Sequence, residues 1–183
     1  METTPPGSHN VSRSERGSSM VETLVVLGLA GLLIGVSSNY SVNSIGREEV
    51  RSAMNEIQTH MQLARSEAIK RNRVCRFTVN TATRVLQVSD LNGTSTTTDD
   101  VVLQSTTLSR RVSFERPGGG AAVTLPVLSG TTYQLDFGSN GAVSGSAGTV
   151  CARGGDRFDQ VTASGGGATR IDRWNGTAWV TGS

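Results

Sequence analysis

The sequence predicts an α+β protein, in which a long N-terminal helix packs on a C-terminal β-rich, sandwich-like domain. Between Met20 and Asn72 the apolar residues form first a continuous run and then a stripe at helical spacing. After Asn72 apolar and polar residues alternate in short segments, which is typical of β-strands. Only 4% of the residues are aromatic, so the core of this domain must be built mainly from valine, leucine, isoleucine and alanine.

The N-terminal third is predicted to contain a membrane segment. An uncharged apolar run from Thr23 to Val36 lies in a helical stretch of about 20 residues, close to the length that a ~30 Å bilayer core requires. Gly31 and Gly35 either allow close helix contacts in lipid or reflect the general frequency of glycine in membrane helices. We expect four segments: a leader at 1–17, a transmembrane helical segment at 18–42, an amphipathic helix at 43–72 and a β-rich domain outside the cytoplasm at 73–183.

Glu22 stands at the head of this apolar run. A carboxylate inside a membrane-spanning segment costs about 2.5–3.5 kcal/mol on insertion scales, so such a residue usually has a partner and a function. A secretory signal peptide is the alternative interpretation. It is disfavoured because the run ends in Gly35-Val36-Ser37-Ser38-Asn39, which is a poor cleavage site.

The amphipathic helix is predicted from apolar residues that recur at steps of three and four, while charged residues occupy the other faces. This pattern predicts one side packed against a sheet rather than a coiled coil. The stripe consists of Val50, Met54, Ile57, Met61, Ala64 and Ala68.

The β-rich part begins with a predicted hairpin, in which Cys75–Val79 and Val85–Val88 are joined by a turn at residues 80–83. Glycine, serine and asparagine turns separate the other expected strands, an arrangement that favours two small sheets. These strands are Val101–Gln104, Val112–Glu115, Val123–Leu128, Thr131–Phe137, Thr149–Ala152, Gln160–Ala163 and Thr169–Trp174.

Several motifs together resemble a known family. A polar leader ending in Gly17, with Glu22 five residues later, resembles the processing site of type IV prepilins and pseudopilins. The helix core Leu63–Arg71 and the strand-turn Leu135–Gly141 are similar to the GspH/FimT branch of these proteins. So are the acidic turn Ser89–Gly93 and the strand Thr149–Cys151.

The resemblance implies a minor pilin or pseudopilin that takes part in the assembly or the tip of a type IV pilus or a type II secretion pseudopilus. It implies cleavage by a prepilin peptidase between Gly17 and Ser18, N-methylation of Ser18 and an assembly role for Glu22. The implied location is a single pass through the inner membrane, with the C-terminal domain in the periplasm or in the filament. The implied partners are other pilins or pseudopilins, the peptidase, an inner-membrane assembly platform, and DNA or a secreted cargo.

The two cysteines, Cys75 and Cys151, suggest a disulfide. A domain outside the cytoplasm lies in an oxidising compartment, and closing a loop of about 77 residues would contribute on the order of 4 kcal/mol. The alternative is that each cysteine is an isolated buried residue.

DNA binding in natural transformation is the alternative function. Arginines gather near the C-terminus beside Trp174 and Trp179, and arginine with aromatic side chains can hold phosphate and stack on bases. Arg170 and Arg173 are the candidate DNA-binding residues, because Gly167–Arg173 resembles a glycine-arginine motif of DNA-binding family members. The competing interpretation is an ion-paired surface, since acidic residues lie among the arginines.

No cofactor, metal site or enzymatic activity is expected. Asp90, Asn92, Asp99 and Asp100 flank a turn but match no complete calcium-binding loop, so a solvated turn is the prediction. The sequence contains no nucleophile elbow, metal-ligand spacing or phosphate-binding loop.

Overall fold

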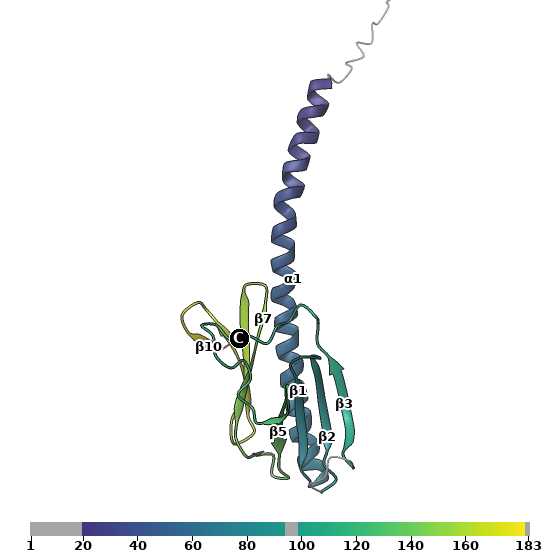
Figure 1. Ribbon diagram of the computed structural model, residues 1–183, viewed down its shortest axis with the longest axis vertical. Helices are drawn as coiled ribbons and strands as arrows, with labels where there is room; N and C mark the ends of the chain where they lie inside the picture. The colour runs from purple at the N-terminus through teal and green to yellow at the C-terminus, as the bar shows by residue number, and fades with distance from the viewer. Residues whose placement is uncertain (1–19, 94–98, 182–183) are drawn as a thin grey trace, which may run out of the picture. The chain divides into compact units, whose positions relative to one another are not determined.

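The structure is a computed structural model that describes residues 20–93 and 99–181, with the backbone alone for residues 34–43 (Figure 1). The chain divides into two compact units at Asn39–Tyr40, and each unit is described by itself. The leader predicted at 1–17 lies outside the described residues.

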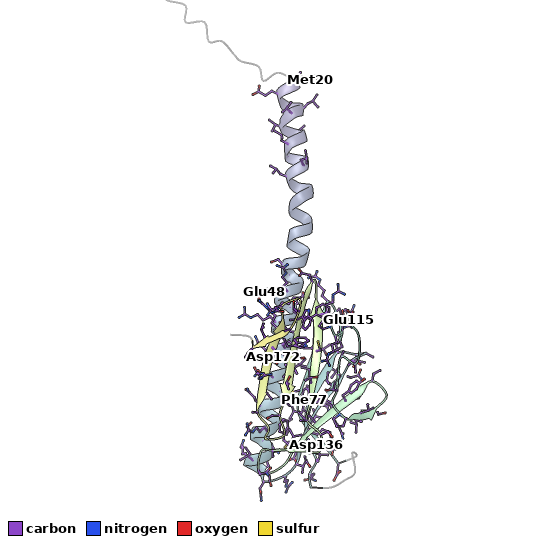
Figure 2. All side chains as sticks on the ribbon, turned by 90° about the vertical axis from the view of Figure 1, so that its left-hand side faces the viewer. Met20, Glu48, Phe77, Glu115, Asp136 and Asp172 are labelled. Carbon is purple, nitrogen blue, oxygen red and sulfur yellow. The ribbon has the colours of Figure 1, made fainter. Side chains whose placement is uncertain are left out.

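Helix α1 (Met20–Arg71) contains both helical stretches that the sequence predicts. Glu22 in its first turn and Lys70 and Arg71 in its last turn complement the helix dipole. In the first unit apolar side chains point to the surface, including Met20 at the start of the helix (Figure 2). By length and hydropathy together, no helix among the described residues qualifies as a membrane span.

In the second unit, the apolar stripe of α1 is fully buried, as predicted. All six of its members have no exposed surface: Val50, Met54, Ile57, Met61, Ala64 and Ala68. They pack into one hydrophobic core with strand residues such as Phe77, Leu86 and Val161. Phe77 is labelled in Figure 2. The predicted α+β fold, with a long helix and a β-rich domain, is therefore confirmed.

The first sheet has the strand order β3-β2-β1-β5-β4, and β6 also pairs with β5. The predicted hairpin is present, because β1 and β2 pair antiparallel with Phe77 opposite Val88. The Asn80 side chain accepts hydrogen bonds from the backbone N–H groups of Ala82 and Thr83, which stabilises the turn. The strands are β1 (Cys75–Asn80), β2 (Val85–Asp90), β3 (Val101–Thr107), β4 (Val127–Ser129), β5 (Thr132–Phe137) and β6 (Val143–Ser144).

Strand β3 forms one edge of this sheet. It has no charged residue and no proline, and Val101 and Val102 are exposed. No other strand of the described residues pairs with its outer side.

The second sheet has the order β10-β9-β8-β7, and every pair is antiparallel. Its strands are β7 (Gly148–Gly154), β8 (Arg157–Ala163), β9 (Thr169–Trp174) and β10 (Trp179–Thr181). Figure 1 shows this sheet and the first sheet beside the C-terminal part of α1.

Two predicted strands are wrong in detail. Val112–Glu115 is not a strand but makes a single bridge, Ser113 to Arg153. Val123–Leu128 is divided into a bridge from Val123 to Val150 and the short strand β4. Pro126 interrupts the second segment because proline has no N–H to donate to a strand partner. The sequence prediction also missed β6 and β10, which are only two and three residues long.

Candidate functional site

The predicted processing residues Gly17 and Ser18 lie outside the described residues. Glu22 is described and is exposed in the first turn of α1, and none of the described residues forms an ion pair with it. Apolar side chains surround it, and such a surface is normally covered by a partner or a membrane. The exposed members are Met20, Val21, Leu24, Val25, Val26, Leu27, Leu29, Leu32 and Leu33.

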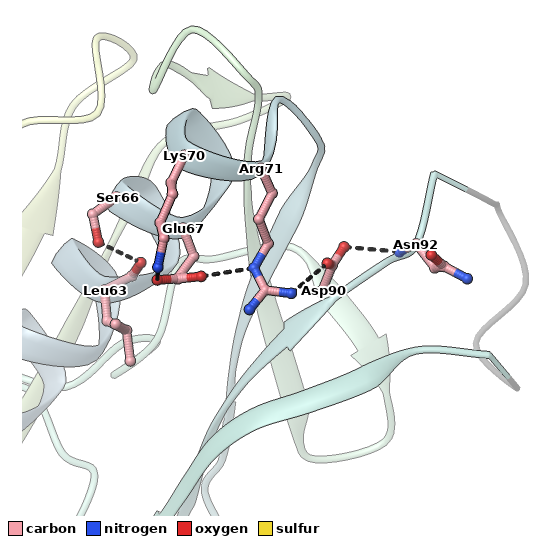
Figure 3. Close-up of polar contacts among 7 residues, drawn as sticks. All are labelled: Leu63, Ser66, Glu67, Lys70, Arg71, Asp90 and Asn92. Carbon is pink, nitrogen blue, oxygen red and sulfur yellow. Dashed lines mark hydrogen bonds and ion pairs between the residues drawn. The ribbon is translucent and has the colours of Figure 1, made fainter.

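The end of α1 is tied to the first hairpin by a chain of ion pairs (Figure 3). Glu67 accepts a hydrogen bond from Arg71 Nε at 2.7 Å, and Arg71 Nη1 donates to Asp90 Oδ2 at 3.1 Å. The second oxygen of the buried Asp90 accepts the backbone N–H of Asn92 at 3.0 Å. The hydrogen bond that Arg71 donates to Glu67 lowers the pKa of Glu67 and raises the pKa of Arg71. Lys70 Nζ adds a longer contact to Glu67, at 3.4 Å.

The same junction holds two more basic residues in contacts with the first sheet. Arg76 Nε and Nη2 bind the two oxygens of Asp136 at 2.7 and 3.0 Å, which raises the pKa of Arg76. Arg73 donates to the Asn92 side chain at 2.7 Å. Arg76 therefore joins β1 to β5 within the first sheet, while Arg73 joins the end of the helix to the turn after β2. Both side chains are engaged in the fold rather than free in an open basic patch.

The acidic turn after β2 is predicted to be solvated, with a calcium site as the alternative. Both oxygens of Asp90 are already occupied, by Arg71 and by the backbone of Asn92. Within 20–93 and 99–181, no three acidic, histidine or cysteine side chains come together as a metal site would require.

The candidate DNA-binding residues Arg170 and Arg173 lie on opposite faces of β9, because successive residues of a strand alternate between faces. Arg170 is paired with the buried Asp172, with its Nε 2.8 Å from Oδ1 and its Nη2 3.0 Å from Oδ2. Gln160 donates a further, longer bond to Asp172, at 3.3 Å. The structure does not bring the two nominated arginines together.

Arg173 instead lines a groove between α1 and the second sheet, which we call the arginine groove. The groove has a volume of about 310 Å³. Arg157 is fixed there, because its Nε binds both oxygens of the buried Asp159 at 2.9 and 2.8 Å. No described residue provides an ion pair or side-chain hydrogen bond to Arg51 or Arg173, and both are exposed. The lining consists of Arg51, Asn55, Arg157, Asp159, Ile171, Arg173, Val180 and Thr181.

A second hollow adjoins the arginine groove and shares Arg157 and Arg173 with it. Trp174 also lines this hollow, and its ring packs edge-on against Trp179 with the centroids 5.4 Å apart. At its border Arg47 Nε donates to Asp156 at 2.7 Å.

Arg51 and Asn55 were not singled out by the sequence pattern. They lie four residues apart on α1 and therefore share a helix face, but an exposed arginine on a helix carries no signal of its own. Only the tertiary packing of α1 against β8 and β9 places Arg51 beside Arg157 and Arg173.

The predicted disulfide between Cys75 and Cys151 is not formed, and both cysteines are free and buried. Cys75 lies in β1 of the first sheet, whereas Cys151 lies in β7 of the second. Burial raises the pKa of Cys75 to about 11 and that of Cys151 to about 12. The structure thus has two free thiols on strands of different sheets in place of the expected bridge, and Cys75 packs in the hydrophobic core as a small hydrophobic residue.

Two solved structures are similar to this chain. The minor pilin FimU of Pseudomonas aeruginosa has 19% identity and a TM-score of 0.52, over 73% of this chain and 93% of FimU, which shows a shared fold. The minor pseudopilin EpsH of the Vibrio cholerae type 2 secretion system has 22% identity and a TM-score of 0.47, over 68% of this chain and 95% of EpsH.

No curated protein matches the sequence. The family model described as type II transport protein GspH matches residues 53–167, which is more than half of the chain. This match begins in the buried stripe of α1 and extends through the first sheet into the second. The chain therefore belongs to the GspH family of type IV pilin-like proteins.

Proposed function

We propose that this chain is a minor pilin or pseudopilin subunit, which takes part in the assembly or the tip of a type IV pilus or a type II secretion pseudopilus. The observation that carries the proposal is Glu22 at the head of an exposed apolar helix in a chain of the GspH family. The family supports a subunit of a filament, and the apolar helix supplies a surface that neighbouring subunits or lipid would cover.

The proposal includes the processing expected from the sequence. A prepilin peptidase cuts after Gly17, and Ser18 becomes the methylated N-terminus. The subunit is held in the inner membrane by its N-terminal helix and is passed to an assembly platform. Its β-rich domain lies on the periplasmic side or in the filament. Mass spectrometry of the protein from its native host tests this step, and an intact leader would contradict it.

Glu22 has a defined role in this proposal. In the filament its carboxylate neutralises the N-terminal amine of a neighbouring subunit, because an unpaired charge in an apolar environment is strongly penalised. Only the correct stagger between subunits brings the two charges together. The work of the protein is thus structural, and no catalytic step is assigned to it.

The test replaces the carboxylate without changing its shape. Glu22→Gln is expected to stay in the membrane fraction but to be depleted from sheared filaments or cross-linked pseudopili. Glu48→Gln is the matched control, because Glu48 is an exposed glutamate of the same helix. Normal incorporation of Glu22→Gln would contradict the proposed role. A deletion strain scored for twitching, transformation and secreted enzymes separates a pilus from a secretion system.

DNA binding in natural transformation is the second candidate. The observation that favours it is that Arg173, exposed and without an acidic partner among the described residues, lines a hollow together with Trp174. Phosphate contacts give a binding constant that falls steeply with salt, so the affinity for duplex DNA is measured at two salt concentrations. A flat salt dependence, or no binding, would exclude this candidate.

A further inference from the structure

We propose that the arginine groove binds the side-chain carboxylate of an aspartate or glutamate presented by a neighbouring subunit. The identification of the partner as another pilin-type subunit rests on the proposed function. The affinity of the groove for a carboxylate does not depend on it.

The charge of the groove is the first support. Three guanidinium groups line it, from Arg51, Arg157 and Arg173, and Asp159 is the one acidic residue of the lining. At pH 7 the lining therefore carries three positive charges and one negative charge, a net charge of about +2. Since like charges in a confined hollow repel, an anion between them is favoured.

The second support is that one guanidinium is already oriented. Arg157 Nε is held by both oxygens of Asp159, whose side chain is only 1% exposed. This bond fixes the plane of the guanidinium, and none of the described side chains forms a hydrogen bond with its Nη groups. A guanidinium that is held in place loses less conformational entropy on binding and suits a two-oxygen ligand.

The chemistry of the remaining lining favours a peptide carboxylate over nucleic acid. Ile171 and Val180 offer apolar contact for the methylene stem of an acidic side chain, while Asn55 offers a hydrogen bond. A duplex instead presents a row of phosphates, which requires a line of cations. Arg170, the nearest arginine on the same strand, lies on the opposite face and is occupied by Asp172.

The first test measures binding to the purified full-length chain in detergent. The probe is N-acetylglutamate N-methylamide, which has a single carboxylate, and the matched control is its glutamine analogue. NMR of ¹⁵N-labelled arginine side chains is expected to show saturable shifts of Arg51, Arg157 and Arg173 with the glutamate probe alone. Equal responses to both probes, or no response, would overturn the proposal.

Two variants on one strand locate the site. Arg173→Gln is expected to weaken binding of the glutamate probe by about three- to fivefold, in the range of an exposed ion pair. Arg170→Gln is expected to leave it unchanged, because Arg170 lies on the other face of β9. Arg157 is not substituted, since its loss would leave Asp159 buried without a partner. An equal effect of both variants would contradict the assignment.

Two further arms test the class of the ligand. Inorganic phosphate and a 12-base-pair duplex are titrated under the same conditions. Binding of either at least tenfold tighter than the glutamate probe would show that the groove is a phosphate site and would overturn the proposal.

The partner is tested in the native host with a photo-cross-linking residue at Val180, which lines the groove and lies opposite Arg173 in the β9–β10 pair, and with one at Ser105 on β3 as the control. Cross-links from position 180 to an acidic segment of a pilin-type subunit are expected. Cross-links only to other classes of protein would refute the identification of the partner as a pilin-type subunit. If the glutamate probe still binds in that case, the carboxylate site stands. Glu22→Gln tests the proposed function separately.

Discussion

The carbonyl oxygen of Gly46 lies against Gly154, so that a Cβ atom at residue 154 would clash with it. Gly46 belongs to α1 and Gly154 to the end of β7, so the helix and the second sheet approach with their backbones. Val50 also lies 2.9 Å from the same Cβ position. The contact leaves no room for a side chain.

Gly154→Ala is therefore expected to lower the free energy of unfolding by about 1–3 kcal/mol, as overpacking in a tight core does. Gly166→Ala is the control, because a Cβ atom there would meet nothing within 4 Å, and a change within about 0.5 kcal/mol is expected. Urea denaturation followed by circular dichroism measures both. Equal stability of Gly154→Ala and the natural protein would show that the helix is not packed as described.

Truncation of the buried stripe tests the core of the second unit. Ile57 is fully buried, whereas Ile69 on the same helix is 51% exposed. Ile57→Ala is expected to lower the free energy of unfolding by about 2–5 kcal/mol, because burial is lost and a cavity is left behind. Ile69→Ala is expected to cost less than about 1 kcal/mol. Urea denaturation measures both variants. If Ile57→Ala and Ile69→Ala lost similar amounts of unfolding free energy, the apolar stripe would not face the core.

The Arg47–Asp156 contact predicts a pH dependence. The hydrogen bond from Arg47 lowers the pKa of Asp156 from 3.8 to about 2. Since the folded protein favours the ionised carboxylate, this contribution to stability is complete above about pH 4 and is lost as the pH falls towards 2.

Asp156→Asn is thus expected to reduce the urea midpoint at pH 6 slightly, while the gap to the natural protein narrows at pH 2.5. The effect is small because both side chains are at least half exposed. A difference that stays constant with pH would contradict the ion pair.

The two cysteines predict the thiol chemistry of the folded protein. With pKa values of about 11 and 12, Cys75 and Cys151 carry thiolate fractions on the order of 10⁻³ or less at pH 8, and both are buried. Ellman's reagent is expected to find no rapidly reacting thiol in the native protein and two after unfolding without reductant. Fewer than two reactive thiols in the unfolded protein would reveal a disulfide between Cys75 and Cys151.

The helix and most strands could be predicted because their signals are local. The spacing of Val50, Met54 and Ile57 identifies the buried face before any partner is known. Strand β9 has the predicted bounds for the same reason, since its residues are bracketed by glycine-rich turns. Short pairings such as β6 and β10 form only where tertiary structure brings the chain together, so two or three residues carry no pattern.

The candidate sites were less predictable because they depend on which strands become neighbours. Compartment and count alone predict a bridge between the cysteines, whereas both are free in the structure, on strands of different sheets. Arg170 and Arg173 looked equivalent in sequence, but the alternation of a strand gives one an acidic partner and turns the other towards the helix. Glu22 was identified by its contrast with the apolar residues around it, which is a local signal.

The outer side of β3 has a practical consequence for work with the isolated subunit. Seven residues of uncharged, β-favouring sequence with open backbone hydrogen-bonding groups are a template for edge-to-edge aggregation. Concentrated samples will tend to form ribbons through this strand. A lysine in place of Val102 would be a rational first change for crystallisation.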